Sequence, residues 1–526
     1  MTPEITRETT LSLLPQQAVD NNYILKNLRK KKELKDIKIN SFRIIRKSID
    51  ARKNPVKINL GILVSNQDKI EPEISFKEFK KLKDNSPEII IVGAGPAGLF
   101  AGLKAIELGI RPIIIERGKD VDSRKPDIAD ISRKGEINPD SNYCFGEGGA
   151  GAFSDGKLYT RSKKRGNVNE VLALLHQFGA SEEILIQSHP HIGSDKLPKI
   201  IKNIRNKIIE CGGEVRFNCR MDGIKIENGK VKGIYTSAGD FIKGDVVLAT
   251  GHSARDTYRL LKELGIEMES KGIAVGVRLE HPQELIDRIQ YHNEEGRGSY
   301  LPPAEYSFVD QADGRGVYSF CMCPGGVIVP AVSGEGQIVV NGMSASARSG
   351  KWADSGYVVE LHPGDINGFS EHEEFEMMAL QESLEAKLAD ASHNTLVAPA
   401  QRISDFINGE TSTSLPSTSY APGIYPDDFN KLFPKEISGR LKQGLLKIGE
   451  RCPEFISNEG VMIGLESRTS SPVRIPRDPE TMQHKTIEGL YPVGEGAGYA
   501  GGIVSSAIDG IKSVEAFYKT RVLKNA

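Results

Sequence analysis

Residues 88–118 read EIIIVGAGPAGLFAGLKAIELGIRPIIIERG, and this stretch decides the fold of the chain. Ile89 to Val92 is a short apolar run of the kind found in buried strands, and Pro112 to Glu116 is a second one. Leu99 to Leu108 between them has the composition of a helix. A strand, a glycine turn, a helix and a second strand in this order predict a parallel βαβ unit.

The turn of this unit is Gly93-Ala94-Gly95-Pro96-Ala97-Gly98, a GxGxxG pattern that directly follows a strand and opens a helix. Gly93 permits the tight turn, Gly95 lets the backbone approach a pyrophosphate, and Gly98 allows the helix to pack against the strands. The helix start adds free N–H groups and the positive end of the helix dipole. We therefore predict that Gly93, Gly95, Pro96, Ala97 and Gly98 bind the phosphates of a dinucleotide.

Glu116 closes the second strand, 23 residues after Gly93. A carboxylate at this place can accept hydrogen bonds from ribose hydroxyls and would repel a 2′-phosphate, which disfavours NADP in this site. We include the adjacent Arg117 in the predicted cofactor site. The alternative is a glycine turn in an unrelated α/β fold, which would leave Glu116 without a ligand.

Two later segments distinguish FAD from NAD. Asp245 to Gly251 reads DVVLATG, and Thr486 to Glu495 reads TIEGLYPVGE. With these motifs the chain resembles the large FAD-binding family of the glutathione-reductase and fumarate-reductase type. The resemblance implies cofactor contacts at Thr250, Gly251, Gly494 and Glu495, although the family usually has Asp at the position of Glu495. The alternative is that both segments are ordinary buried strands.

The resemblance also implies that the last helix begins close to the flavin. Gly502 and Ile503 stand at its expected start, and a positive dipole end there would stabilise the charge of a reduced flavin. In the broader family a glycine-rich loop contacts the pyrophosphate and the flavin ring. Carried over to residues 148–157, this predicts that Gly149, Gly151 and Ser154 contact FAD.

Nearly the whole chain is similar to a narrower group, the bacterial FAD-dependent dehydrogenases, or NAD(P)/FAD-dependent oxidoreductases, whose substrates are not characterised. The motifs that carry this resemblance are RKSIDAR at 46–52, FGEGGAG at 145–151, SDGKL at 154–158, ATGHSARD at 249–256, GVR at 276–278, EHP at 280–282, CPGG at 323–326, ESRTSSPVR at 466–474 and GEGAG at 494–498. The resemblance is specific for the family and says little about the reaction.

Six side chains are candidates for the chemistry: Lys157, His252, Cys321, Cys323, Arg468 and Arg474. Lys157 could stabilise a reduced, anionic flavin or hold an anionic substrate, or it could be a solvated loop lysine. His252 follows the Ala-Thr-Gly strand and titrates near neutrality, whereas His189, His191 and His281 are further acid/base candidates that could equally be structural. Arg468 and Arg474 suit a carboxylate or a phosphate, or they form salt bridges within the fold.

Cys321 and Cys323 follow the strand-like stretch Val317 to Phe320. Residues two apart in a strand share a face, so both sulfurs should point the same way. A redox dithiol is one interpretation, and two packed thiols before a Pro-Gly-Gly turn are the other. A direct CxC disulfide would close a small, strained ring, and two cysteines are too few for a zinc site, so we predict no metal.

The composition excludes several classes of protein. The chain has 526 residues, a net charge of −1 and 38% apolar residues, and it lacks an apolar run long enough to cross a membrane. Its start has acidic and polar residues rather than a basic, then apolar, leader. Six cysteines in such a chain form no disulfide framework. We therefore expect a cytoplasmic flavoprotein that does not bind membranes.

The fold class we predict is α/β, with a Rossmann-type FAD-binding domain, an inserted mixed α+β substrate domain and a small N-terminal α/β domain. The N-terminal domain spans 1–85, with residues 68–87 as its linker, and the FAD-binding domain begins at 86–270. The insertion spans 271–459, and the FAD-binding domain returns at 460–526. From Lys26 to Lys53 twelve Lys or Arg residues face three acidic ones, a local charge of +9.

These observations predict an FAD-dependent oxidoreductase that moves a hydride between a small organic substrate and flavin N5. No second GxGxxG lies between a strand and a helix, so either another external donor reduces the flavin or NAD(P)H docks without that motif. An RNA-modifying or RNA-associated protein, with the basic segment as its docking arm, is the first alternative. A flavin-binding scaffold or redox sensor without turnover is the second.

Overall fold

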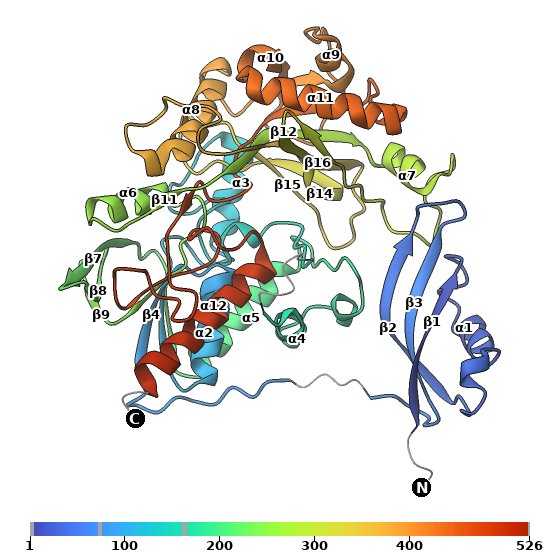
Figure 1. Cartoon of the computed structure of the whole chain (residues 1–526), viewed down its shortest axis with the longest axis horizontal. Coiled ribbons are helices and arrows are strands. Elements are labelled where there is room, and N and C mark those ends of the chain that lie inside the picture. Colours follow the sequence, from blue (N-terminus) through green and yellow to red (C-terminus); the bar gives the residue numbers. More distant parts are fainter. Residues whose placement is uncertain (1–4, 72–75, 160–165, 524–526) are drawn as a thin grey trace.

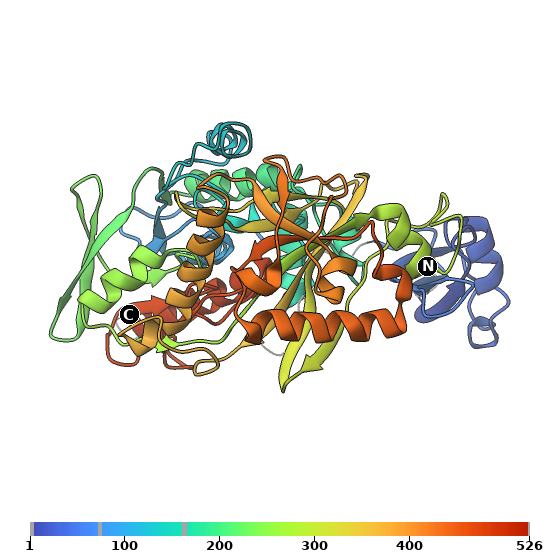
Figure 2. The same cartoon turned by 90° about the horizontal axis from the view of Figure 1, so that it is seen from above.

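The computed structural model of the chain describes residues 5–71, 76–159 and 166–523. Figure 1 shows three parts: a small N-terminal domain at one end, a parallel sheet with its helices, and a second sheet with helices above it. The same order is visible from above in Figure 2. The middle of the predicted linker, residues 72–75, lies outside the described residues.

The N-terminal domain is a three-stranded antiparallel sheet packed on one short helix. Its elements are β1 (Thr6–Leu13), α1 (Asn21–Leu28), β2 (Ser41–Asp50) and β3 (Lys57–Ser65), in the sheet order β1-β3-β2. Alternate residues of β3, from Ile58 to Val64, are buried against α1. Polar residues at alternate positions of β1 mask its strand pattern in the sequence.

The predicted βαβ unit is confirmed as the centre of a five-stranded parallel sheet. Its order is β21-β10-β4-β5-β6, and every neighbouring pair is parallel. The strands are β4 (Glu88–Val92), β5 (Arg111–Ile115), β6 (Glu214–Arg216), β10 (Val246–Leu248) and β21 (Leu490–Pro492). The chain therefore builds outward from β4 in both directions, and ligands in such sheets bind beyond the carboxyl ends of the strands at this point.

Helices cover one face of this sheet. They are α2 (Pro96–Glu107), α4 (Val168–Gln177), α5 (Leu197–Glu210) and α12 (Ile503–Phe517). The helix α3 (Arg124–Lys134) instead packs through Ile131 on residues 331–339 of the second domain. The other face packs on a meander of β7 (Met221–Glu227), β8 (Lys230–Thr236) and β9 (Phe241–Lys243) and on α6 (Arg255–Glu263). Ile89 and Ile91 point into the first core, and Ile90 and Val92 into the second, as expected for a strand buried on both faces.

The second domain is built on a larger mixed sheet with the order β13-β14-β16-β12-β19-β17-β18, to which β15 adds by pairing with β14. The strands are β12 (Ile273–Pro282), β13 (Val309–Ala312), β14 (Arg315–Pro330), β15 (Val340–Met343), β16 (Trp352–Leu361), β17 (Ala398–Arg402), β18 (Ile424–Pro426) and β19 (Val461–Glu466). Its helices are α7 (Gln283–Tyr291), α8 (Glu376–Ala391), α9 (Ile403–Asn408), α10 (Phe429–Leu432) and α11 (Lys435–Arg451).

The chain enters and leaves this second domain through a pair of short strands, β11 (Glu269–Ser270) and β20 (Val473–Arg474), which are antiparallel neighbours. Because β19 pairs with β12 and β17, the second sheet continues to Glu466, and the predicted return at Gly460 is too early. The apolar run of β19 fits either sheet, so periodicity alone could not assign it. Within the described part of the chain, no helix is long and apolar enough to cross a membrane.

Candidate active site

A cavity of about 750 Å³ lies beyond the carboxyl ends of β4, β10 and β21 and extends to strand β14 of the second domain. Its volume is in the range of ligand sites in proteins. Of the predicted cofactor residues, all but Gly98 line it: Gly93, Gly95, Pro96, Ala97, Glu116, Arg117, Gly149, Gly151, Ser154, Thr250, Gly251, Gly494, Glu495, Gly502 and Ile503.

The glycine turn has the geometry that a phosphate-binding loop needs. Gly93 has a φ of +106°, and a Cβ there would lie 2.4 Å from the carbonyl oxygen of Ala249. A Cβ on Gly98 would lie 1.9 Å from the carbonyl oxygen of Gly93, which explains why Gly98 packs behind the cavity wall. At Gly95 the nearest atom to a Cβ would be 3.9 Å away, so this backbone is open to the cavity.

Two helix N-termini converge on the cavity. α2 begins at Pro96 and α12 at Ile503, and the two helices run side by side in Figure 1. A Cβ on Gly510 would lie 2.0 Å from the carbonyl oxygen of Ala97, so glycine permits this close packing. The first N–H groups of each helix have no partner within the helix and can bind anionic or carbonyl oxygens.

Glu116 connects the glycine turn to the loop that follows. Its Oε2 accepts the N–H of Ala94 at 2.9 Å, and its Oε1 accepts the N–H groups of Gly118 and Gly146, both at 3.0 Å. A carboxylate has about four acceptor positions, so a further one on Oε2 can still receive a ribose hydroxyl. The residue thus has a structural role that its position in the sequence does not reveal.

These features fit an FAD molecule. A loop whose backbone is open at Gly95, the N-termini of α2 and α12, and the acid Glu116 together supply donors for a pyrophosphate and an acceptor for a ribose. One dinucleotide along this wall would run from Glu116 and Arg117 toward Glu495 and the start of α12.

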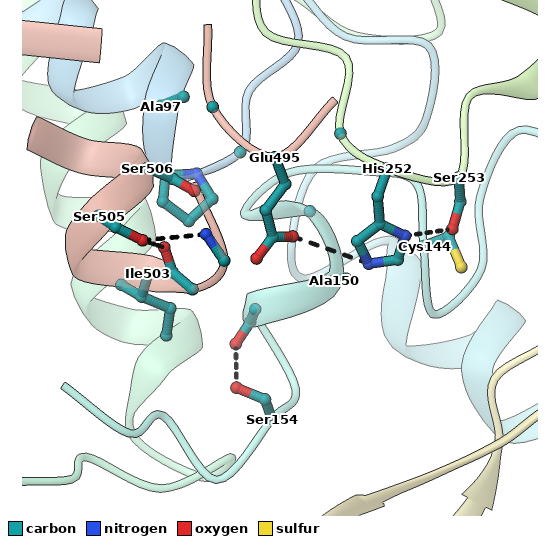
Figure 3. Close-up of a pocket in the computed structure, with 18 of the residues that line it drawn as sticks. Ala97, Cys144, Ala150, Ser154, His252, Ser253, Glu495, Ile503, Ser505 and Ser506 are labelled. Carbon is teal, nitrogen blue, oxygen red and sulfur yellow. Dashed lines mark hydrogen bonds and ion pairs between the residues drawn. The ribbon is translucent and has the colours of Figure 1, made fainter. Parts of the chain in front are cut away.

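Glu495 and His252 face each other across the cavity (Figure 3). Glu495 Oε2 and His252 Nε2 are 3.7 Å apart, and Ser253 Oγ lies 2.9 Å from the other ring nitrogen. Burial raises the pKa of Glu495 to about 7, with Lys271 opposing the shift. Burial, with the charges of Arg468 and Arg255, lowers the pKa of His252 to about 4. At neutral pH the imidazole is therefore uncharged, and Glu495 can hold or release a proton.

Lys157 lies at the far end of the cavity, in contact with Asp155 and with both predicted cysteines. Its Nζ is 2.9 Å from Asp155 Oδ2, 3.8 Å from Cys321 Sγ and 3.5 Å from Cys323 Sγ. Burial opposes its charge, but the two sulfurs and Asp155 raise the pKa of Lys157 above its ordinary value. The lysine is therefore a fixed cation and not a solvated loop residue.

Cys321 lines the cavity, whereas Cys323 is buried directly behind it. The pairing of β14 with β16 shifts register between Phe320 and Cys323, and Cys321 adopts a φ of +47°. This bulge turns both sulfurs toward the same lysine. A hydrogen bond with Cys323 and the charges of Lys157 and Arg278 lower the pKa of Cys321 against the effect of burial, and the pKa of Cys323 is raised.

Arg278 is completely buried, and its contacts hold the bulge at Cys321 in place. Its guanidinium pairs with Asp354 at 2.7 Å and Glu466 at 2.9 Å, and it also donates to the carbonyl oxygen of Cys321 at 2.7 Å. Burial raises the pKa of each acid to about 7, although Arg278 opposes the shift. The arginine that the GVR motif contains is thus a structural support of the thiol cluster.

The two predicted anion-binding arginines have different places. Arg468 lines the cavity, but its guanidinium is bound to Glu385 at 2.8 Å, Ser333 at 2.7 Å and Gln337 at 2.8 Å. Arg474 is exposed on β20, outside the cavity lining, and stacks over Tyr499. Arg468 thus has the salt-bridging role that we considered as its alternative, and the turn at β20 directs Arg474 away from the cavity.

Of the other histidines, His189 also lines the cavity, while His281 is buried and bonded to the carbonyl oxygen of Phe455. His191 contacts the carbonyl oxygen of Ser346 at 3.3 Å.

Sequence reasoning missed Arg348 and Glu305, which complete the far wall. Arg348 Nη2 is 2.6 Å from Asp155 Oδ2, and its Nη1 is 2.5 Å from Glu305 Oε1. Glu305 also lies 3.4 Å from His189 Nδ1. Neither residue belongs to a recognisable motif, and they meet Asp155 only because the second domain folds over the glycine-rich loop.

Comparisons with known proteins give two family matches and one relative of similar length. The family "FAD-dependent protein, C-terminal domain-like" matches residues 272–469, and a domain of unknown function (DUF8436) matches residues 5–65. An uncharacterised protein of Clostridium beijerinckii is 40% identical over 515 residues, which cover 94% of this chain and 96% of that protein.

Solved structures with a similar arrangement are only distant. A geranylgeranyl bacteriochlorophyll reductase-like protein of Thermoplasma acidophilum has a TM-score of 0.34 at 14% identity, over 84% of this chain and 80% of its own. A glycine oxidase of Bacillus cereus has a TM-score of 0.32 at 13% identity, over 83% of this chain and 96% of its own.

Proposed function

Since the chain belongs to one family with the uncharacterised Clostridium beijerinckii protein, and its residues 272–469 match the FAD-dependent C-terminal domain-like family, we propose that it is an oxidoreductase that uses FAD to oxidise or reduce a small organic substrate. The observation that carries the proposal is the convergence of Glu116 and the N-termini of α2 and α12 on one cavity that strand β14 of another domain closes.

When bound, the cofactor would supply hydride transfer at flavin N5, which no side chain of the protein can perform. The residues proposed to hold it are the glycine turn from Gly93 to Gly98, Glu116, Gly149 to Ser154, and the start of α12. The positive end of the α12 dipole favours an electron-rich, anionic ligand next to Gly502 and Ile503.

The substrate would occupy the part of the cavity between this wall and β14. Tyr318, Phe320 and Cys321 of β14 line it, and Tyr306 adds an apolar ring whose hydroxyl is bonded to Ser355 at 2.7 Å. Such a site at a domain junction excludes water and orients a small molecule. Lys157 and Arg348 are balanced by Asp155 and Glu305, so this end of the cavity has no excess charge that would select a cationic over an anionic substrate.

Glu495 and His252 are the proposed proton-handling groups. An uncharged imidazole can accept a proton and a carboxyl group with a pKa of about 7 can donate one, so the pair could move a proton to or from the substrate. Their separation of 3.7 Å leaves them able to contact a ligand instead of each other.

The natural electron donor is part of the proposal: either NAD(P)H docks in the open cavity without a second glycine motif, or another donor reduces the flavin. The test begins with purification from cells and denaturation, after which the supernatant should contain released FAD. Anaerobic addition of NADH, NADPH or other donors should then bleach the visible flavin band. A preparation in which no flavin is released would contradict the proposal.

A pair of variants separates loss of cofactor binding from loss of folding. Gly95→Val should lose FAD because its side chain would fill the open cradle, whereas Gly439→Ala in α11, where a Cβ meets nothing within 4 Å, should retain it. Repeated cycles of bleaching and reoxidation distinguish an enzyme from a flavin-binding scaffold. Equal FAD content in both variants would place the cofactor elsewhere.

A further inference from the structure

The cavity contains two thiols that share one cation. Lys157 Nζ contacts Cys321 Sγ at 3.8 Å and Cys323 Sγ at 3.5 Å, and Arg278 Nη2 lies 3.5 Å from Cys323 Sγ. Cys321 lines the cavity, and Cys323 is fully buried. One thiol therefore faces the cavity, and the second lies buried behind it.

The backbone at Cys321 is in the left-handed region, which residues other than glycine rarely adopt. The hydrogen bond from Arg278 to the Cys321 carbonyl oxygen holds it there. Backbone strain of this kind is concentrated at functional sites, because the surrounding structure must maintain it. Here its effect is to bring the two sulfurs to the same side of β14.

We propose that Cys321 and Cys323 form a redox-active dithiol that exchanges with disulfide substrates in the cavity, with Cys321 as the attacking thiolate and Cys323 as the resolving thiol. Lys157 is the positioning residue that keeps Cys321 ionised. This inference rests on the proposed function and deepens it, because it names the substrate class as a low-molecular-weight or peptide disulfide.

Oxidation of the two thiols balances with the disulfide substrate as the one added reagent. The Cys321 thiolate attacks one sulfur of a disulfide RSSR, the S–S bond breaks, and RS⁻ leaves while a mixed disulfide remains on Cys321. Cys323 gives its proton to the departing RS⁻ and then attacks Cys321 Sγ, which forms the Cys321–Cys323 disulfide and expels the second RS⁻. The ring of this CxC disulfide is small and strained, and strained disulfides are the readily reduced kind that catalysis uses. Recovery of the Cys321 thiolate and the Cys323 thiol consumes two electrons and one proton, which a reduced flavin would supply.

A single reactive cysteine would not need this arrangement. Capture of an electrophilic carbon requires one thiolate, whereas disulfide exchange also requires a second thiol within reach. Cys323 is that second thiol, and its Sγ donates to the carbonyl oxygen of Cys321 at 3.4 Å, next to the thiolate that it would resolve. A pair of inert packed thiols, in turn, would have an apolar surrounding and not two cations.

The charges that face the pair come from several elements. The groups that act on the two sulfurs or are acted on by them are Lys157, Asp155, Arg278, Asp354, Glu466 and Glu495. The cations Lys157 and Arg278 are in direct contact with sulfur, and the acids are not. The two cations favour one thiolate in the pair, and it is assigned to Cys321 because Cys323 donates its own proton to the carbonyl oxygen of Cys321 at 3.4 Å.

The test uses the purified full-length protein with its bound cofactor, oxidised glutathione as the probe, and mass spectrometry. Trypsin should release residues 316–348 as one peptide, whose only cysteines are Cys321 and Cys323. After treatment, the wild-type peptide should lack two hydrogen atoms and carry no glutathione. Cys323→Ser should keep one glutathione on Cys321, and Cys321→Ser should not react.

The role of Lys157 is tested by the pH profile of Cys321 alkylation. At neutral pH wild type should react roughly tenfold faster than Lys157→Met, because the variant loses most of its thiolate, and the two rates should converge at alkaline pH. Lys157→Arg should recover most of the rate. Cys452→Ser, which changes a half-buried thiol of the second domain, is the control that should behave as wild type.

Two results would overturn the proposal: a wild-type peptide that stays reduced, or one that retains glutathione as the Cys323→Ser peptide does. FAD content and flavin bleaching are measured on the same samples. If these are intact while no internal disulfide forms, the dithiol fails and the proposed oxidoreductase stands. If the flavin is absent as well, both proposals fail.

Discussion

The two halves of the cavity are built by different means. The cofactor half consists mostly of backbone: the Gly93–Gly98 turn, the Gly149–Gly151 loop and the starts of α2 and α12. The thiol half consists of charged and sulfur-bearing side chains that contact one another, among them Lys157 and Cys321. The cofactor half binds through backbone N–H groups, whereas the thiol half depends on which side chains occupy particular positions.

This difference separates the ways in which each half can fail. A backbone site is damaged where a new Cβ has no room, and the cost is steric. A site of buried charges is damaged when one partner is removed, because the remaining charge is then left without compensation. The variants below test this contrast, from the largest expected effect to the smallest.

Arg278→Met should have the largest effect. It would leave Asp354 and Glu466 buried without their cation, and loss of one member of a buried ionic group costs about 3–5 kcal/mol. Urea unfolding measures the change. Arg220→Met, which breaks an exposed pair with Asp222, should cost at most about 1 kcal/mol. Similar losses for both variants would refute the distinction between the two halves.

Gly98→Ala should disturb the cofactor half by steric overlap. Its Cβ would be 1.9 Å from the carbonyl oxygen of Gly93, so the turn must shift at a cost of about 1–3 kcal/mol. FAD affinity should fall roughly ten- to hundredfold, measured by fluorescence titration. The thiols should keep their alkylation rates, and a change in those rates would show that the two halves are coupled.

Glu495 lies between the two halves, and Glu495→Gln tests its ionisation through the pH dependence of stability. The pKa of Glu495 is raised in the folded protein, so folding favours its protonated form. The stability that Glu495 contributes is present in full below the pKa that its carboxyl group has in the unfolded chain, and it is lost as pH rises toward 7. After removal of flavin, the variant should be about 1–2 kcal/mol more stable than wild type at pH 7, with little difference at pH 5. A constant difference at both values would contradict this assignment.

Glu305→Gln should have the smallest effect, because Glu305 is partly exposed at the rim. Loss of such an ion pair costs at most about 1 kcal/mol. A hydrogen bond that His189 donates to Glu305 raises the pKa of His189, so the variant should show a lower pKa for this histidine in an NMR titration. His484, whose ring contacts the carbonyl oxygen of Glu267 instead, is the internal reference and should titrate as before.

Much of the cofactor half was predictable from local patterns. The strand before Gly93 and the helix after it were confirmed within a few residues, and the elements β10, β21 and α12 lie in the predicted segments. These elements can be predicted because a glycine turn and an apolar strand are each specified by neighbouring residues in the sequence. The lining role of Glu116 was predicted as well, but its three hydrogen bonds to backbone N–H groups were not.

The thiol half was predictable only as a set of separate candidates. Lys157, Cys321 and Cys323 were singled out, yet nothing in the sequence indicated that the lysine contacts both sulfurs. Arg348 and Glu305 were missed, and the anion-binding role expected of Arg474 is not supported by its exposed position. Contacts between segments more than a hundred residues apart leave no periodic trace in the chain.

The sequence by itself determined the parallel sheet, the glycine turn and the starts of the two helices, because backbone geometry near glycines and apolar runs depends on neighbours in the chain. Only the tertiary structure decided which charges meet at the far end of the cavity. Ionisation of Cys321 and Glu495 depends on burial and on cations brought by distant strands, and these arise when the second domain closes over the first.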